Sequence, residues 1–126
     1  MTPPKWRSWN LFKLMDHTID AKNKNLGRVA SEIAHILQGK HKPNYEGRLA
    51  GDDRVMVKNI KSIGLTGKKR VQKVYYKHAG QLGHLKERKY ADVFAKNPGW
   101  ILRHAVNLML PKNRLRAERI KRLIIE

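Results

Sequence analysis

The stretch HTIDAKNKNLGRVASEIAHILQG, residues 17–39, decides the fold of this chain. Its first five residues, HTIDA, predict a short strand. Asn25 stands where a helix N-cap belongs, and from Leu26 onward apolar residues recur at helical spacing. Gly39 closes the pattern as a C′ glycine does. A strand followed closely by a helix with one buried stripe is therefore predicted. The stripe consists of Leu26, Val29, Ala30, Ile33, Ala34 and Leu37.

Further strands are predicted after this pair. A basic loop, GKHKPNYEG (39–47), leads to RVMVKN (54–59), where Val55 and Val57 share one face of a second strand. Residues 63–66 and 73–77 predict a short third and a short fourth strand. Strand, helix and strand of these lengths favour an α/β domain with at least one parallel pair.

The C-terminal third predicts mainly helix. Residues 89–96 form one predicted helix, and Pro98 can occupy the first turn of another that reaches about residue 110. The apolar stripe expected on that second helix is Ile101, Ala105, Leu108 and Met109. Residues 113–122 are basic and expected to be partly helical, and residues 123–125 predict a terminal strand or core anchor. We expect an N-terminal basic arm over residues 1–15 and a single domain over 16–126.

The composition fits one folded domain with an anionic partner. The chain has 126 residues, 40% of them hydrophobic, which is enough for a real core. Its formal net charge of +18 makes the folded chain repel itself, so RNA, DNA or an anionic membrane surface would compensate the charge. No apolar run approaches the roughly 20 residues of a membrane span. The absence of cysteine excludes disulfides and thiolate zinc sites.

The first 15 residues, MTPPKWRSWNLFKLM, contain three basic residues and no acid. They lack the continuous apolar segment of a secretory signal. This composition favours an organelle-targeting or RNA-contacting arm, and an extended surface arm is equally compatible with it.

The stretch TGKKRVQKVYYKHAGQLGHLKERK, residues 66–89, concentrates cations around two tyrosines and a single acid, Glu87. Lysine and arginine neutralise phosphates, aromatic rings stack on bases, and glycine lets a backbone approach closely. A solvent-facing basic loop is the alternative interpretation. The mixture suits a polyanion better than a small-molecule substrate.

Candidate catalytic groups are few. Asp52 and Asp53 are neighbours whose side chains would point to opposite faces of an extended chain, and Asp52 after Gly51 suits a turn. None of the six histidines has a metal-ligand spacing, and no serine lies in a G-x-S-x-G setting. Gly27 lacks the rest of a G-x-G-x-x-G motif, although Arg28 could reach a phosphate from the helix N-terminus. We expect no enzyme, no metal site and no cofactor.

Four blocks in order carry a family resemblance: DA…LGR.AS.IA…GK.K within residues 19–45, V…TGKK within 51–69, KVYY.H.G within 72–86 and MLPKN.LR within 105–123. Together they resemble the universal large-subunit ribosomal protein L-thirteen family in its bacterial and organellar form. The resemblance implies a three-layer α/β/α domain with a small, mostly parallel sheet and basic RNA-binding loops. It also implies a non-catalytic structural protein that binds large-subunit ribosomal RNA early in assembly, among neighbouring ribosomal proteins.

The motifs and the surrounding cations together give a set of expected RNA-facing residues. Because successive strand residues face opposite sides, only one of Tyr75 and Tyr76 should face RNA, and the sequence leaves open which. The expected set is Arg28, Lys40, Lys42, Lys68, Lys69, Arg70, Lys73, Tyr75, Lys77, His78, Lys86, Lys112, Asn113, Arg114 and Arg116.

Some positions depart from the family pattern. Asp16 and Asp53 stand where aromatic residues are common, and His84 stands where a second glycine is usual. The spacing of Trp9, Phe12 and Asp20 resembles mitochondrial members, so we expect a mitochondrial rather than a bacterial ribosome.

Two other functions stay open. A regulatory RNA-binding protein acting off the ribosome would use the same basic surface. An enzyme acting on nucleic acid would need a cluster of acids, a metal site or a cofactor loop.

Overall fold

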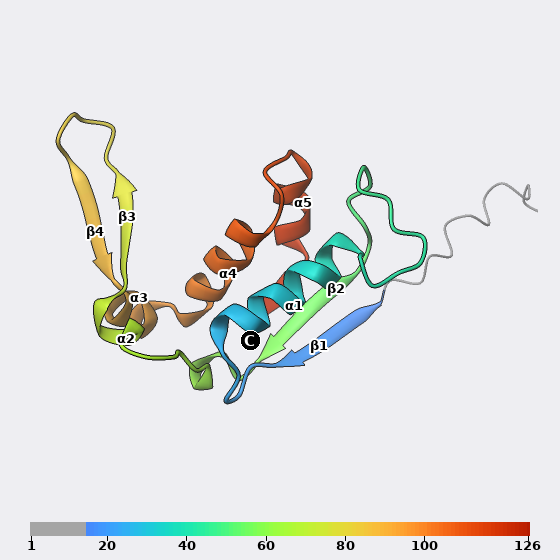
Figure 1. The fold of residues 1–126 in the computed structure, drawn as a ribbon, viewed down its shortest axis with the longest axis horizontal. Coiled ribbons are helices and arrows are strands. Elements are labelled where there is room, and N and C mark those ends of the chain that lie inside the picture. The colour runs from blue at the N-terminus through green and yellow to red at the C-terminus, as the bar shows by residue number, and fades with distance from the viewer. Residues whose placement is uncertain (1–14) are drawn as a thin grey trace, which may run out of the picture.

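The computed structural model describes residues 15–126, and most of the predicted N-terminal arm, residues 1–14, lies outside this range (Figure 1). The chain begins with β1 (Asp16–Asp20), α1 (Leu26–Gln38) and β2 (Arg54–Lys58). The later elements are the 3₁₀ turn η2 (Ile60–Ser62), α2 (Lys69–Gln72), β3 (Val74–His78), β4 (Leu85–Lys89), α3 (Tyr90–Lys96), α4 (Pro98–Met109), α5 (Leu115–Lys121) and β5 (Leu123–Ile125).

The central sheet is parallel. β2 lies between β1 and β5, and both neighbours run in the same direction as β2. The register aligns Ile19 with Val57 and Val57 with Ile125, so these side chains share one face. The predicted α/β class and mostly parallel sheet are confirmed, and the segment 123–125 is a strand of this sheet.

Helix α1 supplies the main partner of that face. All six residues of the predicted stripe are buried, and Val29, Ile33 and Leu37 are completely inaccessible. Burial of each such side chain contributes roughly 1.5–3 kcal/mol. Gly39 ends the helix in the left-handed conformation, with φ of 77°, and its amide donates to the carbonyl of Ile36. The helix predicted from this periodicity is confirmed.

The helices gather on one face of the sheet. α1 contacts β2, α4 and α5, and α4 packs against α5 (Figure 1). Thr18, Met56 and Ile124 are aligned on the opposite face, where Thr18 and Ile124 are exposed and Met56 is half-buried. Residues 15–126 therefore form one layer of helices on one face of the sheet. The family resemblance implies a second layer of helices, and no described helix covers the face that carries Thr18 and Ile124.

Two predicted elements differ from the structure. Residues 63–66 form a single parallel bridge, between Gly64 and Asn25, and no strand. The chain before them turns at Asn59 in the left-handed conformation, and Ile60 and Ile63 are buried around the turn η2. The strand predicted at 73–77 exists as β3, but it pairs antiparallel with β4 in a separate hairpin. The alternating pattern of β4 was not recognised in the sequence, because all five of its side chains are exposed.

The stripe predicted for α4 is also partly wrong. Ile101 is buried, but the other buried residues are Leu102 and Val106. Leu108 and Met109 are 64% and 42% exposed. The reason is that α4 contacts α1, α3, α5 and η2 together, so its buried face is turned away from the side that carries Leu108 and Met109.

Two arginines fasten the C-terminal segment to the loop before β2. Arg119 is only 1% exposed, and its guanidinium donates to the carbonyls of Leu49 and Ala50, at 2.9 and 3.3 Å. Arg122 donates to the carbonyls of Leu37, Ala50 and Asp53. These bonds satisfy backbone acceptors in a loop that has no sheet partner of its own.

Replacement of Arg119 by alanine should destabilise the fold. It would leave the Leu49 carbonyl without a donor, remove one of the two arginine donors to the Ala50 carbonyl and open a void at a buried position, so the free energy of unfolding should fall by about 3 kcal/mol. Denaturant unfolding measures this change. Lys121→Ala, which removes the same charge from an exposed position of α5, should change stability by less than about 0.5 kcal/mol. Equal losses in the two variants would show that the buried hydrogen bonds of Arg119 contribute little.

Candidate nucleic-acid interface

The β3–β4 hairpin extends away from the sheet, and Figure 1 shows it at one end of the molecule. Strand alternation divides its side chains between two faces. Lys73 continues the face of Tyr75 and Lys77, and the cross-strand partners of Tyr75 and Lys77 are Arg88 and Lys86. The face that carries Tyr75 is therefore dominated by cations.

The opposite face of the hairpin is less basic. Tyr76 pairs with Glu87 and His78 with Leu85 on this side. Tyr76 is 62% exposed, and the His78 ring is held by a bond from the Gly80 amide to its Nδ1, at 3.1 Å. Thus His78 does not share a face with Tyr75, although the sequence analysis placed both in one RNA-facing set.

A groove of about 830 Å³ separates the cationic face of the hairpin from the helices. Its floor is apolar, with contributions from Leu65, Leu108 and Met109. Its rim is basic. The cationic residues that line it are Lys69, Lys73, Lys77 and Arg88. The exposed apolar residues of α4 that fell outside the core are thus part of this groove.

Three rings meet at the base of the hairpin. Trp100 and His104 stack at 4.7 Å between centroids and 10° between planes, and Tyr75 meets both edge-on at 5.3 and 5.5 Å. Lys73 Nζ lies 5.4 Å from the centre of the Tyr75 ring. Tyr75 is therefore the tyrosine that packs inward against the core, and Tyr76 is the one that faces solvent.

The electrostatics of this base follow from burial. Burial raises the pKa of Tyr75 above its ordinary value, with a smaller contribution from Tyr90. Burial also lowers the pKa of His104, and the nearby Lys73 ammonium lowers it further. His104 is consequently neutral near pH 7, which suits an imidazole stacked on an indole.

The groove cations carry uncompensated charge. Within residues 15–126 the ion pairs of lysine and arginine join Lys42 to Asp53 and Arg48 to Glu46, and none involves the hairpin. No acid precedes Asp16 in the sequence that could add one there. Desolvating a cation without a partner is costly, so this surface stays hydrated until an anion reaches it.

The other residues of the expected set lie outside the two hairpin strands. Lys68 and Arg70 are exposed beside it, at α2. Arg28, Lys40, Lys112 and Arg114 are exposed elsewhere, and Arg116 is half-buried. Asn113 accepts a bond from the Arg116 amide at 3.2 Å, which orders the turn before α5. The loop that carries Lys40 lies at the other end of the molecule from the hairpin (Figure 1).

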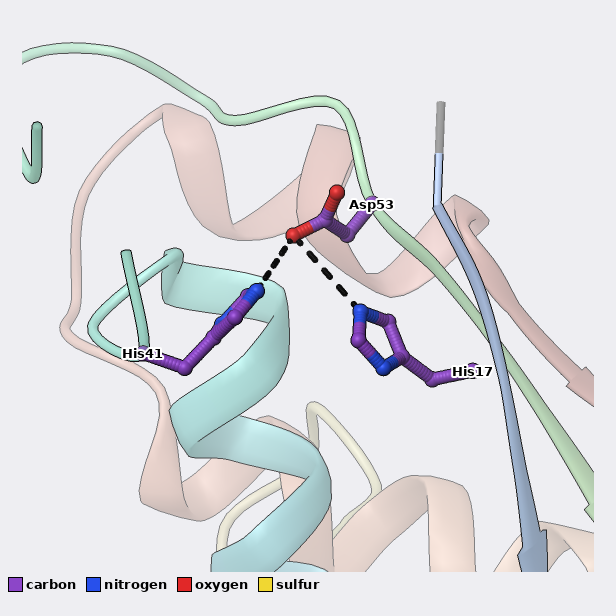
Figure 2. A group of neighbouring side chains, drawn as sticks. All are labelled: His17, His41 and Asp53. Carbon is purple, nitrogen blue, oxygen red and sulfur yellow. Dashed lines mark ion pairs between the residues drawn. The ribbon is translucent and has the colours of Figure 1, made fainter. Parts of the chain in front are cut away.

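Sequence reasoning missed a cluster at the start of the sheet. His17 of β1, His41 of the loop after α1 and Asp53 just before β2 converge, as Figure 2 shows, and Lys42 Nζ is bound to the same Asp53 carboxylate at 2.7 Å. The spacing of these residues along the sequence does not indicate that they meet. The cluster depends on the parallel register of β1 against β2, which places residue 17 opposite residue 55 and therefore near Asp53.

Asp20, at the end of β1, has structural surroundings. Asp20 Oδ1 accepts from the Lys22 amide and from Asn59 Nδ2, both at 2.9 Å. These bonds, with the Asn59 contribution the larger, lower the pKa of Asp20 below its ordinary value. Asp20 therefore joins the turn after β1 to the end of β2, which is a structural role.

Comparisons with known proteins agree with the blocks found in the sequence. The family model described as Ribosomal protein L13 matches residues 15–125. The large ribosomal subunit protein uL13 of Clostridioides difficile (strain 630) is 48% identical over 107 residues, which cover 85% of this chain and 75% of the relative. The uL13 protein of Natranaerobius thermophilus is 50% identical over the same shares.

The uL13 protein of Chloroflexus aggregans is 48% identical over 109 residues, which cover 86% of this chain and 76% of the relative. None of the helices described in residues 15–126 is long and apolar enough to cross a membrane. With a family model that matches nearly the whole described chain and relatives near 50% identity, this chain belongs to the ribosomal protein L13 family.

Proposed function

We propose that this chain is a structural constituent of the large ribosomal subunit and that it binds ribosomal RNA through the groove beside the β3–β4 hairpin. The observation that carries the RNA-binding site is the cationic rim of Lys69, Lys73, Lys77 and Arg88 without acidic partners. The relatives' names, large ribosomal subunit protein uL13, support the assembly in which it acts. The partners are ribosomal RNA and neighbouring large-subunit proteins.

Phosphate neutralisation is the main source of affinity in this proposal. Each lysine or arginine that replaces counterions on the RNA backbone makes binding weaken as salt rises. Lys77 and Arg88 lie on the paired strands β3 and β4. Lys69 lies on α2 and Lys73 just before β3, and all four cations line the same groove, so they can contact phosphates of one RNA segment. Phosphate contacts fix position without reading sequence.

Base contacts would come from the apolar floor and from Tyr76. Folded ribosomal RNA offers unstacked bases, which bind aromatic rings and apolar surfaces. Tyr76 is the exposed tyrosine of the hairpin, whereas Tyr75 is occupied by Trp100 and His104. We therefore assign stacking to Tyr76 and assign Tyr75 to positioning Lys73 beside it.

The other residues of the expected RNA-facing set have different proposed roles. Lys68, Arg70, Lys86, Lys112 and Arg114 keep their proposed phosphate contacts, as do Arg28, Lys40 and Arg116, whereas Asn113 and His78 contribute through the turns they order. Lys42 is omitted, because its ammonium is bound to the buried Asp53 carboxylate.

A role early in subunit assembly follows from the same charge. A chain of net charge +18 reduces the repulsion between RNA segments that must come together. The relatives named above are bacterial, so they give no support to the mitochondrial location expected from residues 9–20. Their names describe a ribosomal protein, which supports neither a nucleic-acid enzyme nor a regulatory role off the ribosome.

Charge reversal at the hairpin base should block incorporation into the subunit. In the triple variant Lys68→Glu, Lys69→Glu and Lys73→Glu, three exposed cations become anions, and the contact of Lys73 with the Tyr75 ring is the one described side-chain interaction that is lost. The fold should persist, as judged by circular dichroism, and the variant should be lost from large-subunit fractions in a sucrose gradient.

A matched control separates this site from total charge. The variant with Lys22, Lys24 and Lys96 changed to glutamate makes the same charge change at exposed positions away from the groove. It should still sediment with large subunits. Normal incorporation of the hairpin variant, or equal loss of both variants, would refute the assignment of the hairpin as the principal contact.

Phosphate contacts and stacking should differ in their salt dependence. Lys77→Met should weaken RNA binding and reduce the slope of log Kobs against log salt concentration by about 1. Tyr76→Ala should cost about 1–3 kcal/mol of binding free energy and leave that slope unchanged. Fluorescence titrations of a large-subunit RNA fragment at several salt concentrations measure both. An unchanged affinity for Tyr76→Ala would remove stacking from the mechanism.

A further inference from the structure

The His17–His41–Asp53 cluster lies where three segments of the chain meet, far along the molecule from the hairpin (Figures 1 and 2). His17 comes from β1, His41 from the loop that follows α1, and Asp53 from the residue that precedes β2. Each side chain offers one ligand atom, and the three atoms lie within 4.8 Å of one another. The RNA-binding proposal makes no use of this cluster.

The Asp53 carboxylate is the centre of the cluster. Its side chain is 2% exposed, and its Oδ2 lies 2.9 Å from His41 Nε2 and 3.9 Å from His17 Nε2. Although His41 is close, neither Asp53 Oδ2 nor His17 Nε2 has a well-directed hydrogen-bond partner within the described residues, and both atoms are buried. Buried polar atoms normally find partners, so an arrangement of this kind calls for a further group between them.

The other carboxylate oxygen is already occupied. Lys42 Nζ donates to Asp53 Oδ1 at 2.7 Å. This bond fixes the plane of the carboxylate and directs Oδ2 towards the two imidazoles (Figure 2). Carboxylates that bind metals are commonly held in this way through their second oxygen.

We propose that His17, His41 and Asp53 bind a divalent transition-metal ion, with Zn²⁺ as the expected occupant. Two imidazole nitrogens and one carboxylate oxygen are ligands of the type that Zn²⁺ uses, whereas Mg²⁺ and Ca²⁺ require oxygen ligands. The His17 and His41 side chains are 28% and 27% exposed, which leaves solvent access for a water molecule in the fourth position.

The distances fit this ion. Metal–ligand bonds of about 2.0–2.2 Å in a tetrahedral site put the ligand atoms about 3.3–3.5 Å apart. The observed separations from Asp53 Oδ2, 2.9 and 3.9 Å, lie on either side of that range. The three ligand atoms already lie within 4.8 Å of one another, so the side chains are gathered on the scale of a metal site.

Metal binding would join the basic loop to the sheet. The loop of residues 39–53 forms only short turns of its own, and His41 is its link to β1 in the cluster. A bound ion would connect that loop to two adjacent strands by three bonds. The metal would thus act as a structural clamp, and its stability effect can be measured without RNA.

The test is a metal titration of the full 126-residue chain. Isothermal titration with Zn²⁺ should give one saturable site, Co²⁺ should give the visible absorption of a four-coordinate complex, and Zn²⁺ should raise the Tm. His17→Gln and His41→Gln should each weaken binding more than the roughly 10–100-fold cost of losing a supporting second-layer contact. Both side chains are partly exposed, so both variants should fold.

A matched histidine controls for adventitious binding. His35 is exposed on α1 and outside the cluster, so His35→Gln should retain the affinity and the Co²⁺ spectrum of the unmodified chain. The proposal is overturned by the absence of saturable Zn²⁺ binding to the unmodified chain. It is equally overturned if His17→Gln and His41→Gln bind Zn²⁺ as tightly as His35→Gln, since the ion would then be held elsewhere.

Discussion

Parallel pairing requires β1, β2 and β5 to begin at one edge of the sheet, and the rest of the structure is arranged around that edge. The segments that enter the three strands must meet there, each with backbone groups that the sheet does not satisfy. Arg122 supplies donors to the carbonyl of Asp53, and the side chain of Asp53 accepts from Lys42. Polar contacts of high sequence separation therefore concentrate at a single edge, while the apolar core lies between the sheet and α1.

The chain uses its positive charge in two distinct ways. Arg119 and Arg122 are turned inward, where a planar guanidinium with several donors can satisfy clustered carbonyls. The lysines of the hairpin stay hydrated on a surface where, among the described residues, no acid forms an ion pair with them. The basic run at residues 114–122 is thus partly structural, and the run at 66–89 is the one that remains available to an anionic partner.

Sequence periodicity was sufficient to predict the buried residues of an element with one buried face, as in α1. It was insufficient for an element that several other elements contact, as in α4. Leu102 and Val106 of α4 became buried because α4 contacts four elements at once, and Leu108 and Met109 became groove residues. The candidate RNA interface was identified from the motifs, but the division between Tyr75 and Tyr76 depended on the position of Trp100. The histidine–aspartate cluster needed the strand register, which local spacing does not contain.

The exposed hairpin has a consequence for how the domain meets its partner. All five side chains of β4 are solvent-accessible, and a two-stranded ribbon with so little buried surface is marginally stable by itself. Its backbone amides should exchange with solvent far faster than those of β2, whose Val55 and Val57 are inaccessible. Tyr75 fastens the base of the hairpin to the core, so this fast exchange belongs to the exposed part of the ribbon. Contact with an anionic partner would cover the exposed side chains and slow the exchange of the hairpin amides.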